Sequence, residues 1–187
     1  MDLFGERGYR ATRVADIEAR AGLSPRAGGF YRHFASKEEA FRAALDRWIA
    51  EVAAFPTTPD ELLPLDDLRS ELLVVARGVL RLLDRQRELF RFLGRDGTEF
   101  PALVAHVHDQ LVARGYTQTM QFLAARLPNT APPDYRLRAL AANALGALVH
   151  YHQDTVMYGH PPADAAEPDF VDAWVDLWCC WFDHHAD

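Results

Sequence analysis

Apolar residues recur at intervals of three and four along almost the whole chain, and short clusters of proline and glycine interrupt them. This spacing places apolar side chains on one face of successive helices. No stretch alternates apolar and polar residues in the way that a half-buried strand does. The sequence therefore predicts an all-α fold, in which a small N-terminal three-helix unit precedes a larger helical region.

The helix ends are marked by residues that favour caps and breaks. Thr12, Ser24 and Ser36 are candidate N-caps, and Glu39 completes a capping box with Ser36. Phe55–Pro64 holds three prolines and is expected to be a linker. We expect helices over 2–8, 12–20, 25–33, 36–54, 66–93 with a break near Arg85, 101–127 with a break near Gly115, 134–158 and 168–184.

Size and composition indicate a globular protein. The chain has 187 residues, of which 49% are hydrophobic, and this is enough apolar material for a core. Its longest apolar stretch, 139–149, is too short to cross a bilayer, and its N-terminus lacks the pattern of a signal peptide. The two cysteines, Cys179 and Cys180, are adjacent and cannot build a disulfide framework. We expect a cytoplasmic protein without a membrane partner.

The charge is distributed unevenly along the chain. The net charge is -7, yet the stretch Arg7–Lys37 carries seven basic and two acidic residues, a net of +5. Residues 38–187 carry a net of -10. A basic module on an acidic body predicts that only the module meets an anionic partner.

Catalytic and metal motifs are absent from the sequence. Histidines at positions 106 and 108, and at 150 and 152, are two residues apart, so on a helix they point to different faces. There is no HExxH, no GxSxG elbow and no P-loop. We expect neither an enzyme, a metal site nor a cofactor.

The first 54 residues carry the most informative pattern. Two short helices joined at Gly22 and followed by a third are typical of a helix-turn-helix, whose second helix enters the major groove of DNA. An ordinary helical hairpin with solvated arginines gives the same spacing.

The residues themselves carry a family resemblance. The run LFGERGYRAT at residues 3–12 resembles the opening of the TetR family of transcriptional regulators, as do VADI at 14–17, AGLS at 21–24 and FYRHFASKE at 30–38. This resemblance covers residues 1 to about 54. It implies a DNA-binding domain with its connecting helix at 1–54 and an all-helical ligand-sensing and dimerisation domain at 55–187.

The resemblance also implies a function. Members of this family are homodimeric repressors of palindromic operators, released by a small molecule, and the effector expected here is partly apolar. An activator fits the same residues, because the position of the operator, which the sequence does not contain, decides between repression and activation. The alternative hypothesis is a ligand-binding helical dimer whose N-terminal unit no longer binds DNA well.

Family roles transfer onto matching positions of this sequence. Phosphate contacts are implied for Thr12, Tyr31, His33 and Lys37, and base reading for Arg26 and its neighbours, because arginine pairs with guanine bidentately. Arg32 fits either role. Six residues separate Ser24 from Tyr31 where the family usually has four. The implied DNA-binding set is Thr12, Arg26, Ala27, Gly28, Tyr31, Arg32, His33 and Lys37.

Two further sets of residues are expected in the remainder of the chain. Aromatic, methionine and histidine side chains that could line an effector pocket, but that also fit plain core, are Phe90, Phe92, His106, Tyr116, Met120, Tyr151 and Met157. The last two helices are expected to pair two copies, although a packed monomer core explains the same residues. The expected dimer-interface residues are Ala142, Gly146, Trp174, Trp178 and Trp181.

Overall fold

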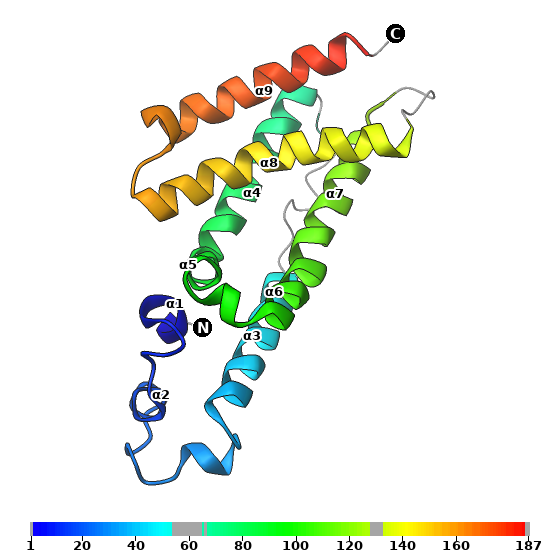
Figure 1. The fold of residues 1–187 in the computed structure, drawn as a ribbon. Helices are drawn as coiled ribbons and strands as arrows, with labels where there is room; N and C mark the ends of the chain where they lie inside the picture. The colour runs from blue at the N-terminus through cyan, green and yellow to red at the C-terminus, as the bar shows by residue number, and fades with distance from the viewer. Residues whose placement is uncertain (1, 54–64, 66, 128–132, 186–187) are drawn as a thin grey trace. The chain divides into compact units, whose positions relative to one another are not determined.

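The computed structural model describes residues 2–53, 65, 67–127 and 133–185. Within these ranges every regular element is a helix or a helical turn and none is a strand, so the all-α prediction is confirmed. The chain forms two compact units (Figure 1), one made of Met1–Phe55 and Gln86–His108, the other of Pro56–Arg85 and Asp109–Asp187. Residues 86–108 thus belong to the same compact unit as the N-terminal segment, whereas the sequence analysis assigned them to the expected domain at 55–187.

The first unit is built around an aromatic core. Phe4, Phe41 and Phe92 are buried at its centre, with Phe41 within 4.8 Å of both other rings by centroid. Tyr9 and Phe100 pack against this group, and the Tyr9 ring makes edge contacts with the rings of Phe41 and Phe100. The elements of this unit are α1 (Asp2–Arg7), α2 (Val14–Arg20), η1 (Phe30–Arg32), α3 (Lys37–Ala53), α5 (Arg87–Asp96), η3 (Gly97–Glu99) and α6 (Pro101–Val107).

Helix α5 holds the short helix α1 in place. The guanidinium of Arg95 donates hydrogen bonds to the carbonyl oxygens of Phe4 at 2.9 Å and Gly5 at 3.1 Å. These carbonyls lie toward the C-terminal end of α1, where that of Phe4 also accepts the N–H of Gly8 at 2.9 Å, and a cation at this end suits the helix dipole. The carboxylate of Asp96 accepts from the backbone N–H of Tyr9 at 3.1 Å. Segments almost ninety residues apart in sequence therefore fix the start of this unit.

The second unit consists of packed helices. Helix α8 packs against α4 and α7, and α9 packs against α4. The core includes Trp174, whose indole N–H donates to the carbonyl of Ala144 at 3.0 Å, and Tyr151, which stacks on Phe170 with ring centroids 4.2 Å apart. The elements are α4 (Leu68–Arg85), η4 (His108–Val112), α7 (Ala113–Ala124), α8 (Asp134–Tyr158), η5 (Pro162–Asp164) and α9 (Glu167–Asp183).

The expected helix boundaries hold in most places. The helix over 134–158 is confirmed, and the expected break near Arg85 occurs at Gln86. The expected break at Gly115 is wrong, because the irregular turn lies earlier, in η4, where the hydrogen bonding is π-helical. The expected linker Phe55–Pro64 lies outside the described residues.

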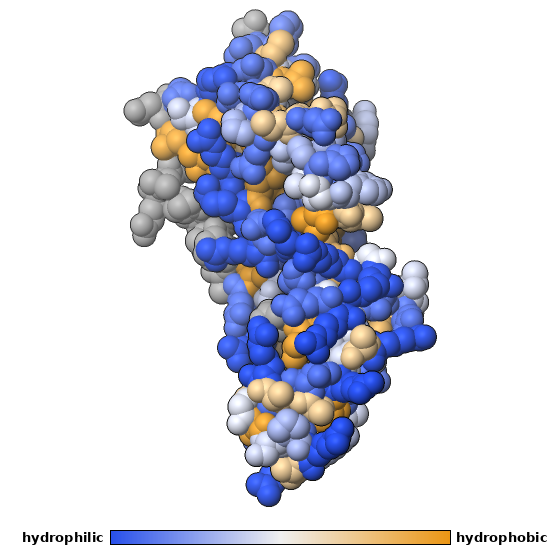
Figure 2. Space-filling model, turned by 90° about the vertical axis from the view of Figure 1, so that its left-hand side faces the viewer, coloured by the Kyte–Doolittle hydropathy of each residue, from blue (hydrophilic) through white to orange (hydrophobic). Residues whose placement is uncertain are grey.

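Among the described residues no helix is long and apolar enough to cross a membrane. The face drawn in Figure 2 shows hydrophobic residues in separate patches among hydrophilic ones. The residues that the structure describes contain no group of three or more histidine, cysteine or acidic side chains that could hold a metal ion.

Candidate nucleic-acid interface

Helix α2 begins one residue later than the sequence predicts. Arg13 is its N-cap, and the backbone N–H of Arg13 donates to the carboxylate of Asp16 at 2.9 Å. The prediction of Thr12 as the cap is therefore wrong. The hydroxyl of Thr12 donates instead to the carbonyl of Gly8 at 2.7 Å, and it lies 3.1 Å from the carbonyl of Leu3.

Burial removes Thr12 from the predicted set of phosphate contacts. Its side chain has 0% exposure, so a phosphate group has no access to the hydroxyl in this structure. The threonine instead ties the loop after α1 back to that helix, because both acceptors are main-chain carbonyls of α1 or its end. The sequence pattern identified the residue but not the direction in which its hydroxyl points.

The predicted second helix of the helix-turn-helix, 25–33, is wrong. Between α2 and α3 the only helical element is η1, a single turn of 3-10 helix whose N-cap is Gly29. Arg26 has φ 65° and Gly28 has φ 74°, and this left-handed conformation cannot continue a right-handed helix. The two extra residues between Ser24 and Tyr31 are therefore accommodated as a loop over 24–29 rather than as added helix.

This loop and turn expose most of the predicted DNA-binding residues. Arg26, Ala27 and Gly28 are exposed on the loop, and Arg32 and His33 are exposed around η1. Tyr31 is 63% exposed, while its neighbour Phe30 is 2% exposed and anchors the turn in the unit. The edge of the Phe30 ring meets the Tyr31 ring at 5.2 Å. The loop 24–29 and η1 together thus form one exposed surface, which we call the loop surface.

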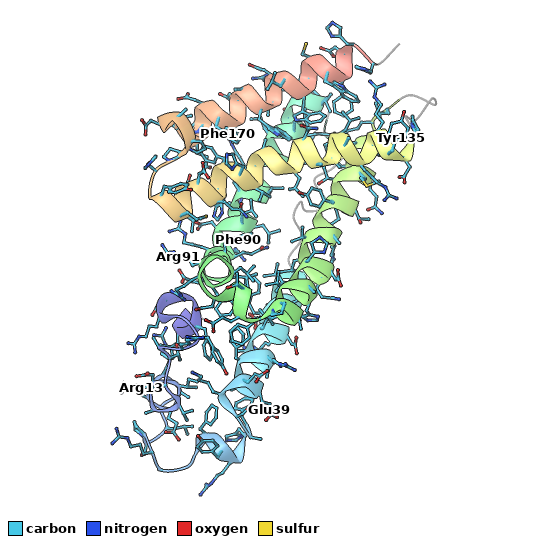
Figure 3. All side chains as sticks on the ribbon, in the orientation of Figure 1. Arg13, Glu39, Phe90, Arg91, Tyr135 and Phe170 are labelled. Atoms are coloured by element: carbon cyan, nitrogen blue, oxygen red, sulfur yellow. The ribbon has the colours of Figure 1, made fainter. Side chains whose placement is uncertain are left out.

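Six of the seven basic residues of the stretch 7–37 are exposed, and the seventh, Lys37, is half-buried. The only acidic residues of this stretch are Asp16 and Glu18, and both direct carboxylate oxygens at backbone N–H groups. Asp16 also lies 3.4 Å from the exposed guanidinium of Arg7. Figure 3 shows Arg13 at the start of α2. Cationic side chains on an exposed surface attract the phosphate backbone of nucleic acids.

Lys37 is half-buried and holds two segments together. Its ammonium donates to the carbonyls of Tyr9 at 2.8 Å and Thr12 at 3.0 Å, and lies 4.2 Å from the centroid of the Tyr9 ring. Burial, and then the charge of Glu38, raise the pKa of the Tyr9 phenol. Because an ammonium has three donors, one N–H of Lys37 is left for the predicted phosphate contact.

The start of α3 is capped as the sequence predicts. The backbone N–H of Glu39 donates to the hydroxyl of Ser36 at 3.1 Å, and the carboxylate of Glu39 accepts from the backbone N–H of Ala35 at 2.6 Å. This reciprocal arrangement satisfies two donors at the helix start. It fixes where α3 begins, and therefore where Lys37 and the end of the loop surface lie.

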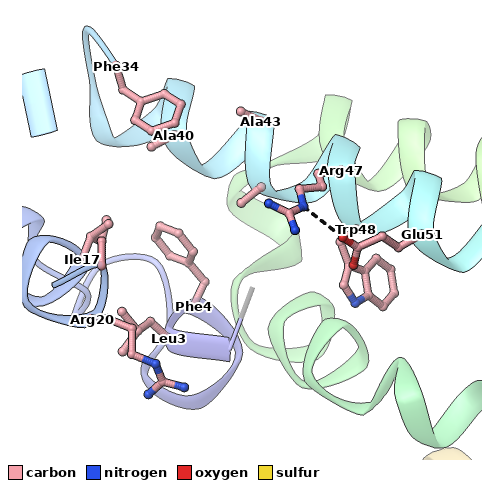
Figure 4. Close-up of a pocket in the computed structure, with 12 residues that line it drawn as sticks. Leu3, Phe4, Ile17, Arg20, Phe34, Ala40, Ala43, Arg47, Trp48 and Glu51 are labelled. Atoms are coloured by element: carbon pink, nitrogen blue, oxygen red, sulfur yellow. Dashed lines mark hydrogen bonds and ion pairs between the residues drawn. The ribbon is translucent and has the colours of Figure 1, made fainter. Parts of the chain in front are cut away.

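Two hollows open on the first unit. The larger, of about 680 Å³, lies among α1, α2 and α3 (Figure 4). The smaller, of about 400 Å³, is lined by residues of α3, by residues 99–100 and by α6, and it includes His106, which lies 3.1 Å from Asp46. The larger hollow is lined by Leu3, Phe4, Ile17, Arg20, Ala21, Phe34, Ala40, Ala43, Ala44, Arg47, Trp48 and Glu51.

The residues predicted to line an effector pocket divide between the two units. His106 is the only one of the seven that lines either hollow. Phe92 is fully buried in the aromatic core, Tyr151 donates its hydroxyl to the carbonyl of Ala165, and Met157 is 64% exposed. Phe90, Phe92 and His106 belong to the first unit, whereas Tyr116, Met120, Tyr151 and Met157 belong to the second.

The residues predicted for a dimer interface also differ in exposure. Trp174 and Trp178 are 6% and 9% exposed, so they pack within their own unit. Ala142 is exposed, Trp181 is half-buried, and a Cβ added at Gly146 would meet open space. Leu177, which widens the apolar face of the last helix in the sequence, has a side chain that is 72% exposed on α9.

Comparison with known proteins identifies relatives of the N-terminal unit. Residues 1–44 match the family described as bacterial regulatory proteins, tetR family. Over 54 residues the chain is 44% identical to the HTH-type transcriptional repressor ComR of Escherichia coli strain K12. That alignment covers 29% of this chain and 25% of the repressor, so the match spans about a quarter of the length of that relative.

Proposed function

We propose that the chain is a transcriptional regulator that binds double-stranded DNA, because residues 1–44 match the tetR family of bacterial regulatory proteins. The observation that carries the proposal is the loop surface, which follows α2 in the chain. It exposes the side chains of Arg26, Tyr31, Arg32 and His33. Arginine at such a site donates hydrogen bonds to guanine or to phosphate, and tyrosine and histidine donate to phosphate oxygens. The relative over 54 residues is named a transcriptional repressor, and we propose repression here as well.

We propose that two copies act together on a palindromic operator. One short loop and one turn reach few base pairs, and pairing through a two-fold axis doubles the contacts. The second unit supplies the pairing surface in this proposal, through Ala142, Gly146 and Trp181 as predicted, with exposed Leu177 added. Trp174 and Trp178 support that surface from inside their unit.

Release by a small, partly apolar ligand completes the proposed function. Such an effector acts only when it binds the DNA-incompetent conformation better than the competent one. The chain passes between the two units three times, at 55/56, 85/86 and 108/109. We propose that an effector bound in the second unit acts on the first through those crossings, two of which lie at irregular turns, Gln86 and η4.

One observation favours a second candidate function. The element that enters the major groove in helix-turn-helix proteins is a helix, and here that element is a loop with a single helical turn. A ligand-binding helical dimer whose N-terminal unit binds DNA weakly fits this observation. The two functions differ in whether specific DNA competes better than bulk DNA.

The experiment is a titration of the purified chain on the DNA upstream of its own gene, at two salt concentrations. We expect a discrete, salt-sensitive complex that specific DNA displaces and bulk DNA does not. Arg32→Ala should weaken this complex, whereas Arg138→Ala, which removes the same charge from an exposed site on α8, should not. Equal weakening by both variants, or equal competition by bulk DNA, would favour the second function.

A further inference from the structure

Glu18 is a buried carboxylate at the centre of the proposed DNA-binding unit. It lies on α2 with 2% exposure. One carboxylate oxygen accepts the backbone N–H of Arg26 at 2.7 Å, and the other accepts the backbone N–H of Phe30 at 3.2 Å. The main-chain carbonyl of Glu18 accepts the N–H of Leu23 at 2.8 Å. A single residue of α2 therefore fastens the loop surface at two points and the residue just before it at a third.

Besides its bonds to Glu18, the loop has one backbone hydrogen bond of its own, from the N–H of Ala27 to the carbonyl of Ser24 at 3.2 Å. Between Ser24 and Phe30 its side chains are those of proline, alanine, two glycines and the exposed Arg26. The side chain of Leu23 lies beside Gly29, where an added Cβ would be 3.4 Å from it. A buried carboxylate is unfavourable unless hydrogen bonds compensate its lost hydration, and here two charge-assisted bonds do so. These bonds are specific to one arrangement of the loop.

The conformation of Arg26 depends on the same carboxylate. Its φ of 65° is a left-handed conformation that residues with a Cβ seldom adopt. Such a conformation persists where surrounding contacts determine it, and the bond from its N–H to Glu18 is one of these contacts. The bond holds the backbone from which the exposed guanidinium extends.

Occupation of these amides also affects how DNA can be contacted. The N–H groups of Arg26 and Phe30 are directed at Glu18, so they are not offered to a phosphate group. Contacts to DNA then come from side chains of the loop surface. Their placement, rather than the number of cations, decides which bases are read.

We propose that Glu18 is the positioning residue for base reading, holding loop 24–29 rigid so that the loop takes the place of a recognition helix. The proposal rests on the DNA binding proposed above, and it adds the element and the residue that determine specificity. It makes two predictions, one for the free protein and one for the complex.

In the free protein, the amides of Arg26 and Phe30 report on the anchor directly. We expect their hydrogen exchange to be slow in the parent and at least tenfold faster in Glu18→Ala, with the amides of α5 unchanged. In Glu18→Gln one acceptor oxygen remains, so one of the two amides should stay protected. If these two amides exchanged at the parent rate in Glu18→Ala, the proposal would be overturned, and this measurement needs no DNA.

In the complex, the informative quantity is the ratio of affinities for operator and bulk DNA. Glu18→Gln should lower operator affinity by tenfold or more and leave bulk affinity unchanged or higher, because a negative charge is removed. A variant that merely folds less well loses both affinities by the same factor, so an unchanged ratio overturns the proposal. Glu38→Gln removes the same charge from an exposed site in the same unit and should leave the ratio at the parent value.

Failure of this proposal is distinguishable from failure of the proposed function. A parent that binds operator and a Glu18→Gln variant with an unchanged ratio overturn the positioning role alone. A parent that binds no DNA overturns both, and slow exchange at Arg26 and Phe30 would then assign Glu18 a role in folding only.

Discussion

The backbone of Gly5 lies directly against Glu88, so that a Cβ added to the glycine would be 2.5 Å from the Cβ of Glu88 and 2.9 Å from its main-chain oxygen. These distances are shorter than any real Cβ contact, and the main-chain oxygen belongs to α5 and cannot rotate away. Helix α1 can therefore approach α5 only where it has no side chain. The contact brings the helix end within reach of Arg95, which bonds to the carbonyl of Gly5.

Gly5→Ala should destabilise the first unit. The added methyl group forces α1 away from α5, and overpacking of this kind costs about 1–3 kcal/mol. Gly94→Ala is the matched control, because Gly94 lies within α5 and a Cβ there meets open space. That substitution should stabilise the protein by about 0.5–1 kcal/mol, since alanine favours helix. Urea unfolding of both variants tests the pair, and equal effects would contradict the close contact.

The ion pair of Glu71 and Arg126 should matter more to stability than exposed pairs in the same unit. Glu71 is 4% exposed and accepts the backbone N–H of Leu65 as well as the guanidinium of Arg126, which also lies over the Phe122 ring. Arg126→Ala leaves a buried carboxylate without its cation, which costs about 3 kcal/mol.

The exposed pair of Arg138 and Asp134 provides the control. Arg138→Ala should change the free energy of unfolding by less than about 0.5 kcal/mol, because water screens this pair. Urea titrations followed by circular dichroism compare the two variants. A loss in Arg126→Ala no larger than in Arg138→Ala would show that burial does not strengthen the first pair.

Much of the fold could be predicted because its signals are local. Helix α8 was predicted from end to end, since residues 134–158 contain no proline and are followed by Gly159, which adopts φ 81° at the C-cap. The cap at Ser36 was predicted for the same reason, as its partner Glu39 is three residues away. Signals of this kind need no knowledge of the rest of the chain.

The candidate site was harder to predict because its contacts are not local. The loop over 24–29 depends on Glu18, which bonds to residues eight and twelve positions away and reads in sequence as one more polar helical residue. Lys37 bonds to the carbonyl of Tyr9, twenty-eight positions away. Two adjacent glycines at 28 and 29 were the local warning against a helix.

The start of α4 should contribute a pH-dependent part of the stability. The carboxylate of Asp67 accepts the backbone N–H of Ser70 at 2.8 Å, and this bond holds the pKa of Asp67 below its usual value of 3.8. A depressed pKa means that the stabilisation is complete above the unfolded-state value and is lost as the pH falls through the folded-state value.

Asp67→Asn separates this contribution from that of the other carboxylates. Asparagine caps a helix about as well as aspartate but does not titrate. The melting temperature of the variant should therefore fall less between pH 5 and pH 3 than that of the parent. All other carboxylates titrate in both proteins and cancel in the comparison. Identical pH profiles for the two proteins would show that Asp67 does not cap α4 in solution.

Lys37 should contribute to folding as well as to DNA binding. Lys37→Met removes the donor to the carbonyls of Tyr9 and Thr12 and the cation over the Tyr9 ring, at a cost of about 1–3 kcal/mol. Tyr31→Phe removes only a hydroxyl from a ring that is 63% exposed, so its effect on unfolding should stay within about 0.5 kcal/mol.

The two variants therefore separate folding from contact with DNA. We expect Tyr31→Phe to weaken binding equally on all DNA sequences at unchanged stability, because its hydroxyl is assigned to a phosphate and phosphates carry no sequence information. Lys37→Met should weaken binding and also unfold at a lower urea concentration. Unfolding of Lys37→Met at the parent midpoint would mean that its ammonium is free in solution, and the phosphate contact would then be its main role.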